Sequence, residues 1–127
     1  MAVVTDKNLI VEALTRAVDK IYPSRETLEK ELLSGKRLRI YLGVDPTGPH
    51  LHLGHLTNLL TLKRFQRLGH EIIFLIGDFT ARIGDPTDKL SPRQPLTPEE
   101  IKENLKTFRK QAGRILKFAG ENRVQSK

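Results

Sequence analysis

The stretch YLGVDPTGPHLHLGHL, residues 41–56, decides the fold of this chain. It begins as an apolar strand, turns at residues 45–49 and continues as a helix from about Leu51. Two prolines and a glycine within five residues predict a loop, because proline lacks an N–H group and restricts the residue before it to extended conformations. A strand, a tight loop and a helix in this order direct the free N–H groups of the helix N-terminus toward an anion.

Polar groups gather where this helix begins. His52 and His55 are three residues apart, so both imidazoles lie on one face of the first helical turn. Gly54 has no Cβ and lets a flat group lie against the backbone. Thr47 adds a hydroxyl from the preceding loop. Together these groups predict a site for a polyphosphate.

Two helices are predicted before this stretch. Residues 5–21 carry apolar side chains at helical spacing, with Thr5 placed to cap the N-terminus. Ser24 is placed to cap a second helix that ends at residues 34–35. This second helix is expected to bury Leu28, Leu32 and Leu33.

Residues 37–77 predict a β-α-β unit. In the strand at 37–44, Leu38, Ile40, Leu42 and Val44 share one face, and Tyr41 points to the other side. The helix runs to about Leu68, is ended by Gly69, and has an apolar stripe of Leu53, Leu56, Leu59, Leu60 and Phe65. The continuous apolar run at 71–77 is typical of a strand buried on both faces of a parallel sheet.

After an irregular segment at 78–96, a strong helix start follows. Thr97 can cap, Pro98 is the first helical residue and Glu100 can complete a capping box. The helix is expected to run to Gly120, with a stripe of Ile101, Leu105, Phe108, Ala112, Ile115 and Ala119. Residues 121–127 show no pattern and are expected to be disordered.

These elements predict an α/β chain that forms the front half of a doubly wound, Rossmann-like parallel sheet with N-terminal helices. We expect one nucleotide-binding domain over residues 1–127. It divides into a helical lead-in at 1–36, the β-α-β unit at 37–77, an active-site loop at 78–96 and a helix at 97–120.

Composition excludes several classes of protein. The chain has no cysteine, so disulfides and cysteine-bound metals are excluded. It has no apolar run long enough to span a bilayer and no signal-peptide pattern, so a cytoplasmic protein without a membrane partner is expected. The net charge is +7, and residues 101–127 hold eight Lys or Arg against two Glu. Such a face suits RNA phosphates, although the lack of interleaved aromatic residues favours a solvated helix surface.

The sequence HLGH at residues 52–55 resembles the H-I-G-H signature of class I aminoacyl-tRNA synthetases. GVDPT at 43–47 and GDP at 84–86 narrow the resemblance to the bacterial tyrosyl-tRNA synthetases. It covers residues 41–93 with matching spacing and continues more loosely to about Phe118. The chain therefore resembles the N-terminal part of the catalytic domain. The rest of the tyrosine pocket, the K-M-S-K-S loop and the anticodon-binding region have no counterpart in these residues.

The resemblance implies an ATP site, with Mg²⁺ as the counter-ion of the nucleotide. Thr47 and His52 match positions that contact the γ-phosphate as the transition state forms. His55 matches a histidine beside the ribose and α-phosphate, and Gly54 matches a glycine that makes room for adenosine. Asp45 matches an acid at the junction of tyrosine and ATP.

The resemblance also implies a tyrosine site and a tRNA(Tyr) partner, with a homodimer for the full-length enzyme. Asp85 matches the acid that holds the substrate ammonium, and Tyr41 matches a tyrosine that hydrogen-bonds the substrate phenol. Lys89 and Arg93 match two cations that meet pyrophosphate in the transition state. From the residues alone, Tyr41 could equally be a core aromatic, and Lys89 and Arg93 could be solvated loop charges.

Some positions depart from the family pattern. Asp88 stands where a glycine is common, and Leu42 and Asn58 replace a cysteine and a threonine near the ribose. His50 and His70 are interpreted as structural. The alternatives are a tryptophanyl-tRNA synthetase, a nucleotidylyltransferase, or a catalytically incomplete nucleotide- or RNA-binding fragment.

Overall fold

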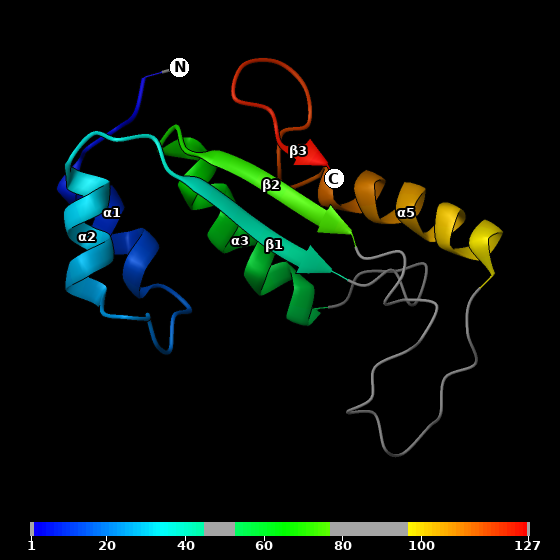
Figure 1. Ribbon diagram of the computed structural model, residues 1–127, viewed down its shortest axis with the longest axis horizontal. Coiled ribbons are helices and arrows are strands. Elements are labelled where there is room, and N and C mark those ends of the chain that lie inside the picture. Colours follow the sequence, from blue (N-terminus) through cyan, green and yellow to red (C-terminus); the bar gives the residue numbers. More distant parts are fainter. Residues whose placement is uncertain (1, 45–52, 77–96, 127) are drawn as a thin grey trace.

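The computed structural model describes residues 2–44, 53–76 and 97–126. Its described strands form one parallel sheet in the order β1-β2-β3, with helices packed against it (Figure 1). The α/β class with a parallel sheet is therefore confirmed. The elements in chain order are α1 Lys7–Thr15, α2 Arg25–Leu33, β1 Arg39–Val44, α3 Leu53–Arg67, β2 Glu71–Ile76, α5 Pro98–Ala112 and β3 Gln125–Ser126.

Helix α1 is shorter than predicted at both ends. Its N-cap is Asp6, whose carboxylate accepts the Leu9 N–H at 3.1 Å, so the prediction of Thr5 as the cap was wrong. The helix ends at Thr15, and Ala17 adopts a positive φ of 58° that a helix cannot include. Ile21 still packs against the core, but from a non-helical segment. Ile21 is therefore a core residue, as the apolar spacing predicted, but it does not belong to the helix.

Helix α2 follows the sequence prediction. Ser24 caps it by accepting the Thr27 N–H, and Ser34 and the left-handed Gly35 end it. Leu32 is fully buried, but Leu33 remains 41% exposed, contrary to its predicted burial. The two helices lie side by side at the left of the sheet in Figure 1.

Strands β1 and β2 pair in parallel from Arg39↔Glu71 to Val44↔Ile76. The predicted alternation of β1 is confirmed, since Leu38, Ile40, Leu42 and Val44 pack against the core and Tyr41 is exposed on the opposite face. In β2, Ile72, Ile73 and Phe74 are all buried, which confirms a strand covered on both faces. A β-α-β unit of this kind brings the carboxyl ends of both strands to one edge of the sheet.

Helix α3 crosses the core face of the sheet with Leu59, Leu62 and Phe65 buried. The predicted stripe was wrong at Leu53 and Leu60, which are 80% and 37% exposed. Leu60 lies about 100° around the helix from Leu59, so the buried face is narrower than the run of leucines suggests. Gly69 ends the helix at φ 89°, and a Cβ there would approach the Ala2 carbonyl oxygen to 2.7 Å.

Helix α5 begins with the predicted capping box of Thr97 and Glu100. It ends at Ala112 with Gly113 as the C-cap, so the predicted extension to Gly120 was wrong. Leu116 is buried, and it lies in the turns that follow the helix rather than in a further helical turn.

The segment after Gly120 was predicted to be disordered, and that prediction was wrong for the part that the structure describes. Asn122 turns the chain with a φ of 54°, and Val124 enters the core. The short strand β3 then pairs with β2 through Ile73↔Gln125 and Phe74↔Ser126. This pairing joins residues far apart in sequence, which a two-residue strand cannot reveal by periodicity.

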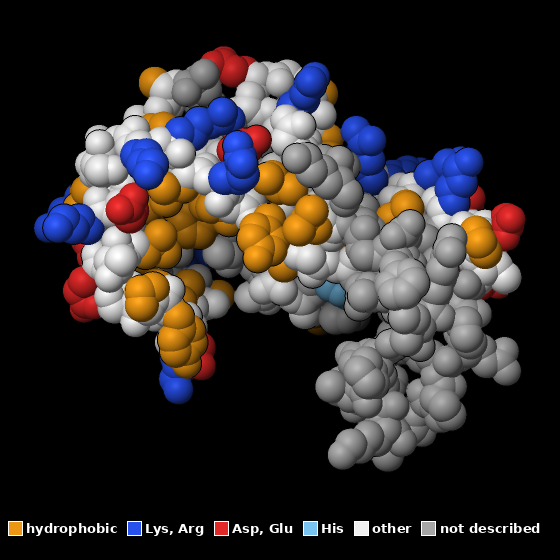
Figure 2. Space-filling view, viewed as in Figure 1, with side chains coloured by type: hydrophobic (Ala, Val, Ile, Leu, Met, Phe, Trp, Pro, Cys, Tyr) orange, Lys and Arg blue, Asp and Glu red, His pale blue; other side chains and the backbone are white. Residues whose placement is uncertain are grey.

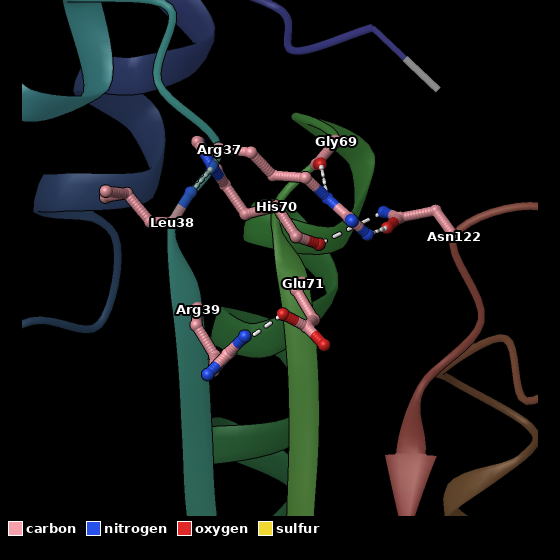
Figure 3. A network of polar contacts seen from close by, with 7 residues as sticks. All are labelled: Arg37, Leu38, Arg39, Gly69, His70, Glu71 and Asn122. Atoms are coloured by element: carbon pink, nitrogen blue, oxygen red, sulfur yellow. Dashed lines mark hydrogen bonds and ion pairs between the residues drawn. The ribbon is translucent and has the colours of Figure 1, made fainter.

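A set of side-chain hydrogen bonds holds this C-terminal segment at the amino end of β2. We call Arg37, Gln66, His70 and Asn122 the polar clasp. Asn122 Nδ2 donates to the Gln66 carbonyl at 3.0 Å and to the His70 carbonyl at 3.1 Å. Its Oδ1 accepts from Arg37 at 2.6 Å, and Figure 3 shows the contacts of Asn122 with Arg37 and His70. Gln66 donates to the Lys117 and Asn122 carbonyls and accepts the Lys117 N–H. The clasp thus joins α3, β2 and the C-terminal segment.

No helix in residues 2–44, 53–76 and 97–126 is both long and apolar enough to cross a membrane.

Candidate active site

The candidate site lies at the carboxyl edge of the parallel sheet. Strands β1 and β2 end together at Val44 and Ile76, and the described part of α3 begins at that same edge (Figure 1). The start of a helix presents free N–H groups and the positive end of its dipole. Clefts beyond the carboxyl ends of parallel strands are the usual ligand sites of such sheets. This edge can therefore receive an anionic ligand.

One face of β1 is open beside this edge. Tyr41 is 68% exposed, and its strand neighbour across the ladder is Ile73. Gly43 lies on the same face, and a Cβ built there would meet no atom within 4 Å. A flat group could therefore lie against the strand at Gly43, next to the Tyr41 side chain. The sequence predicted Tyr41 as a site residue, and no sequence signal pointed to the open backbone at Gly43.

His55 lies in the first described turn of α3 and is half-buried. Its ring centroid is 6.3 Å from that of Phe108 in α5, with the planes tilted by 50°. Phe108 is 2% exposed, so a fixed side chain bounds the imidazole on one side. Helix α5 thus contacts the first described turn of α3 through this pair of rings. The sequence predicted Phe108 as a core residue, and no sequence signal pointed to its contact with His55.

The structure describes two of the positions that depart from the family pattern, Leu42 and Asn58. Leu42 points into the core, so only its backbone is available to a ligand at this edge. Asn58 is exposed on α3, one turn beyond Gly54. Gly54 itself is exposed in the first described turn.

The structure describes only part of the predicted site. Tyr41, Gly54 and His55 belong to the elements that meet at the carboxyl edge. The other predicted site residues lie outside the described residues, and their roles stay predictions: Asp45, Thr47, His52, Asp85, Lys89 and Arg93. Asp88 and His50 lie outside them as well.

His70 was interpreted as structural, and the structure agrees. Its side chain is fully buried at the start of β2, and Nδ1 accepts the Leu38 N–H at 3.1 Å (Figure 3). Burial, followed by the positive charge of Arg37, lowers the pKa of His70 from 6.5. An unprotonated Nδ1 is the form that accepts this hydrogen bond, so the imidazole is held neutral as part of the fold.

Comparisons with known proteins identify the family. A family model described as tRNA synthetases class I (W and Y) matches residues 33–126. The tyrosine–tRNA ligase of Coxiella burnetii is 55% identical over 105 residues, which are 83% of this chain and 26% of that protein. The ligase of Carboxydothermus hydrogenoformans is 51% identical over 109 residues, which are 84% of this chain and 26% of that protein. The chain thus spans about a quarter of the length of these curated relatives.

Solved structures give the same result. The tyrosyl-tRNA synthetase of Archaeoglobus fulgidus, solved in complex with L-tyrosine, superposes with a TM-score of 0.69 at 25% identity, over 95% of this chain and 34% of that one. A mitochondrial tyrosyl-tRNA synthetase of Coccidioides posadasii gives a TM-score of 0.60 at 33% identity, over 76% of this chain and 25% of that one. The two curated relatives named above are tyrosine–tRNA ligases, and the chain belongs to the class I tRNA synthetases for tryptophan and tyrosine.

Proposed function

We propose that this chain carries the nucleotide-binding part of a tyrosine–tRNA ligase. Such an enzyme activates tyrosine with ATP to tyrosyl-adenylate and transfers the tyrosyl group to tRNA(Tyr). The observation that carries the proposal is the HLGH motif, whose last three residues begin the described part of α3, in a chain with relatives named tyrosine–tRNA ligases at about half identity. Those names favour tyrosine over tryptophan as the amino acid.

In this proposal, ATP binds at the carboxyl edge with its phosphates toward the start of α3. The carboxylate of tyrosine attacks the α-phosphorus, and pyrophosphate leaves, so negative charge grows on the phosphates. Positioned donors and cations lower the barrier most where that charge develops. Thr47 and His52 take the γ-phosphate, and Lys89 and Arg93 meet the departing pyrophosphate. Mg²⁺ accompanies the nucleotide and neutralises part of its charge.

His55 and Gly54 take the ribose and α-phosphate side of the nucleotide. The contact of His55 with the buried Phe108 supports this role, because it limits how the imidazole can move before ATP arrives. The exposed Gly54 supports it too, since a residue without a side chain leaves room for adenosine.

Tyrosine binds on the open face of β1 in this proposal. The Tyr41 hydroxyl hydrogen-bonds the substrate phenol, Asp85 pairs with the substrate ammonium, and Asp45 lies where tyrosine and ATP meet. The exposure of Tyr41 and the open backbone at Gly43 support this placement. We further propose that the full-length enzyme is a cytoplasmic homodimer, as the resemblance implies.

The decisive experiment is tyrosine-dependent exchange of labelled pyrophosphate into ATP. It should be run on this chain alone and on the chain joined to the C-terminal remainder of the Coxiella relative. We expect exchange in the joined protein that requires tyrosine and is not supported by tryptophan. ATP binding without tyrosine-dependent exchange in the joined protein would instead favour a non-catalytic nucleotide-binding role. Exchange that depends on tryptophan would contradict the assigned amino acid.

A further inference from the structure

A basic hollow lies at the C-terminal ends of α3 and α5, whereas the candidate active site lies at the N-terminal end of α3. It forms where the C-terminal turn of α3 meets the turns that follow α5, and its volume is about 430 Å³. Its lining includes four cations, Lys63, Arg67, Arg114 and Lys117, and one carboxylate, Glu121, among the described residues. A hollow of this size is large enough for a nucleotide-sized group.

The four cations have no ion-pair partner among the residues that the structure describes. Two helix C-termini, those of α3 and α5, lie nearby and each carries about half a negative charge. Together with the carboxylate of Glu121, these dipoles offset roughly two of the four positive charges. The helix ends and Glu121 therefore neutralise only part of the positive charge of the four cations. The rest of that positive charge is available to an external anion.

The basic surface extends beyond this hollow. A second depression of about 490 Å³ shares Gly113 and Arg114 with the first and adds Lys106, Arg109 and Lys110 of α5. The Arg109 guanidinium lies over the Phe118 ring at 5.5 Å, which holds its charge at the surface. Figure 2 shows Lys and Arg side chains gathered over α5. We call the two depressions together the basic surface.

We propose that the basic surface binds the phosphate backbone of RNA. A single small anion would need one closed cluster of donors, whereas here cations continue across two joined depressions. A nucleic-acid strand presents phosphates at repeated spacing and is the polyanion that such a surface fits. The inference deepens the proposed function, because it assigns a surface of this chain to the tRNA that the function requires.

The test is binding of a fluorescently labelled tRNA transcript to the 127-residue chain, measured by anisotropy over a range of salt concentrations. Arg114→Gln/Lys117→Gln removes two exposed cations whose side chains make no described hydrogen bond or ion pair. We expect the Kd to rise on the order of tenfold and the slope of log Kd against log salt to fall by about 1.4–1.8. Arg25→Gln/Lys36→Gln makes the same change in net charge on exposed residues elsewhere and should alter the Kd less than about twofold. Equal effects of the two variants would overturn the proposal.

Two further measurements distinguish RNA binding from misfolding of the variants and from a small-anion site. Circular dichroism should show that both double variants keep the parent's helix content and unfolding midpoint. Inorganic pyrophosphate should displace the RNA only at concentrations where it also acts as bulk salt, and tight displacement would mean a small-anion site instead. RNA binding here requires neither ATP nor tyrosine. Loss of pyrophosphate exchange with intact RNA binding would therefore contradict only the proposed function, and the converse result only this inference.

Discussion

The two ends of the parallel sheet are built differently. At the amino end, the polar clasp gives the described side chains of Gln66 and Asn122 several hydrogen bonds each, to segments far apart in sequence. At the carboxyl end, Tyr41 is largely exposed and Gly43 has open space above its backbone. Side chains at the amino end hydrogen-bond to other parts of the fold, although His70 Nε2 is buried there without a described partner. Exposed groups at the carboxyl end remain accessible to a ligand.

This difference separates what holds the fold from what acts on substrates. Strand pairing and the clasp fix the strand directions, so the geometry of the carboxyl edge does not depend on the exposed side chains there. Phe108 connects the fold to the site through its contact with the ring of His55. Changes at the carboxyl edge should therefore alter activity more than stability, and changes in the clasp should do the reverse.

The largest expected effect is on catalysis. His52→Ala or Thr47→Ala, in the chain joined to the remainder of a relative, should lower kcat for tyrosyl-adenylate formation by about 10²–10³-fold, or about 2.7–4 kcal/mol. Donors aimed at charge that develops only as the bond breaks stabilise the transition state more than bound ATP. Single-turnover kinetics with varied ATP measures the two effects separately.

Asp85→Ala provides the contrasting variant in the same assay. It should mainly raise the KM for tyrosine, because the substrate ammonium is present both before and during the reaction. If His52→Ala raised the ATP dissociation constant and left the maximal rate unchanged, the histidine would be a binding group and the assigned mechanism would be wrong.

The next effect is on the clasp. Gln66→Ala should lower the free energy of unfolding by about 2–3 kcal/mol, because it removes three part-buried hydrogen bonds made by a buried side chain. Denaturant unfolding measures the change. Asn8→Ala, on the exposed side of α1, should stay within about 0.5 kcal/mol. Similar losses for both variants would show that the clasp adds no particular stability.

The sequence predicted the elements whose signals are local. The capping box at Thr97 and the alternation of β1 appear in the structure as expected, since a few neighbouring residues determine them. The misplaced cap of α1 is a local error of one residue, whereas other errors came from non-local effects. Val124 and β3 are ordered by pairing with β2 and by burial, and Ala17 leaves the helix although the apolar spacing continues.

The site divides in the same way. Gly54 and His55 were predicted from a motif that is contiguous in sequence, and both lie in the first described turn of α3. Their roles stay predictions. The contact of His55 with Phe108 depends on where α5 lies relative to α3, which no spacing in the sequence encodes. The open backbone at Gly43 likewise depends on what covers one face of the sheet.

A third prediction concerns the pH dependence of stability. The folded-state pKa of His70 is lowered by burial and by Arg37, so the unfolded chain binds a proton at this residue more readily than the folded chain. The free energy of unfolding is therefore highest above pH 6.5 and should fall as the pH drops from there toward the folded-state pKa. One such group contributes a slope of at most about 1.4 kcal/mol per pH unit.

His70→Asn tests this assignment, since the amide oxygen can still accept the Leu38 N–H while the titration is removed. Denaturant unfolding at a series of pH values should give a flatter profile below pH 6.5 for the variant than for the parent. A profile with the parent's slope would assign the pH dependence to the other histidines of the chain.

The smallest effects compare two arginines at the start of β1. Arg37 donates to the Gly69 carbonyl at 3.1 Å and to Asn122, as part of the clasp. Arg39 pairs with Glu71 across the ladder at 2.9 Å, but its side chain is 73% exposed (Figure 3).

Arg39→Gln should lower the free energy of unfolding by less than about 1 kcal/mol, because exposed ion pairs are screened by solvent. Arg37→Gln should cost more, about 1–2 kcal/mol, because it also leaves clasp acceptors unpaired. Both variants lose one positive charge, so denaturant unfolding at low and high salt distinguishes them: only the Arg39 effect should largely vanish at high salt. If both variants lost the same unfolding free energy and both losses disappeared at high salt, the clasp would contribute no more than an ordinary surface contact.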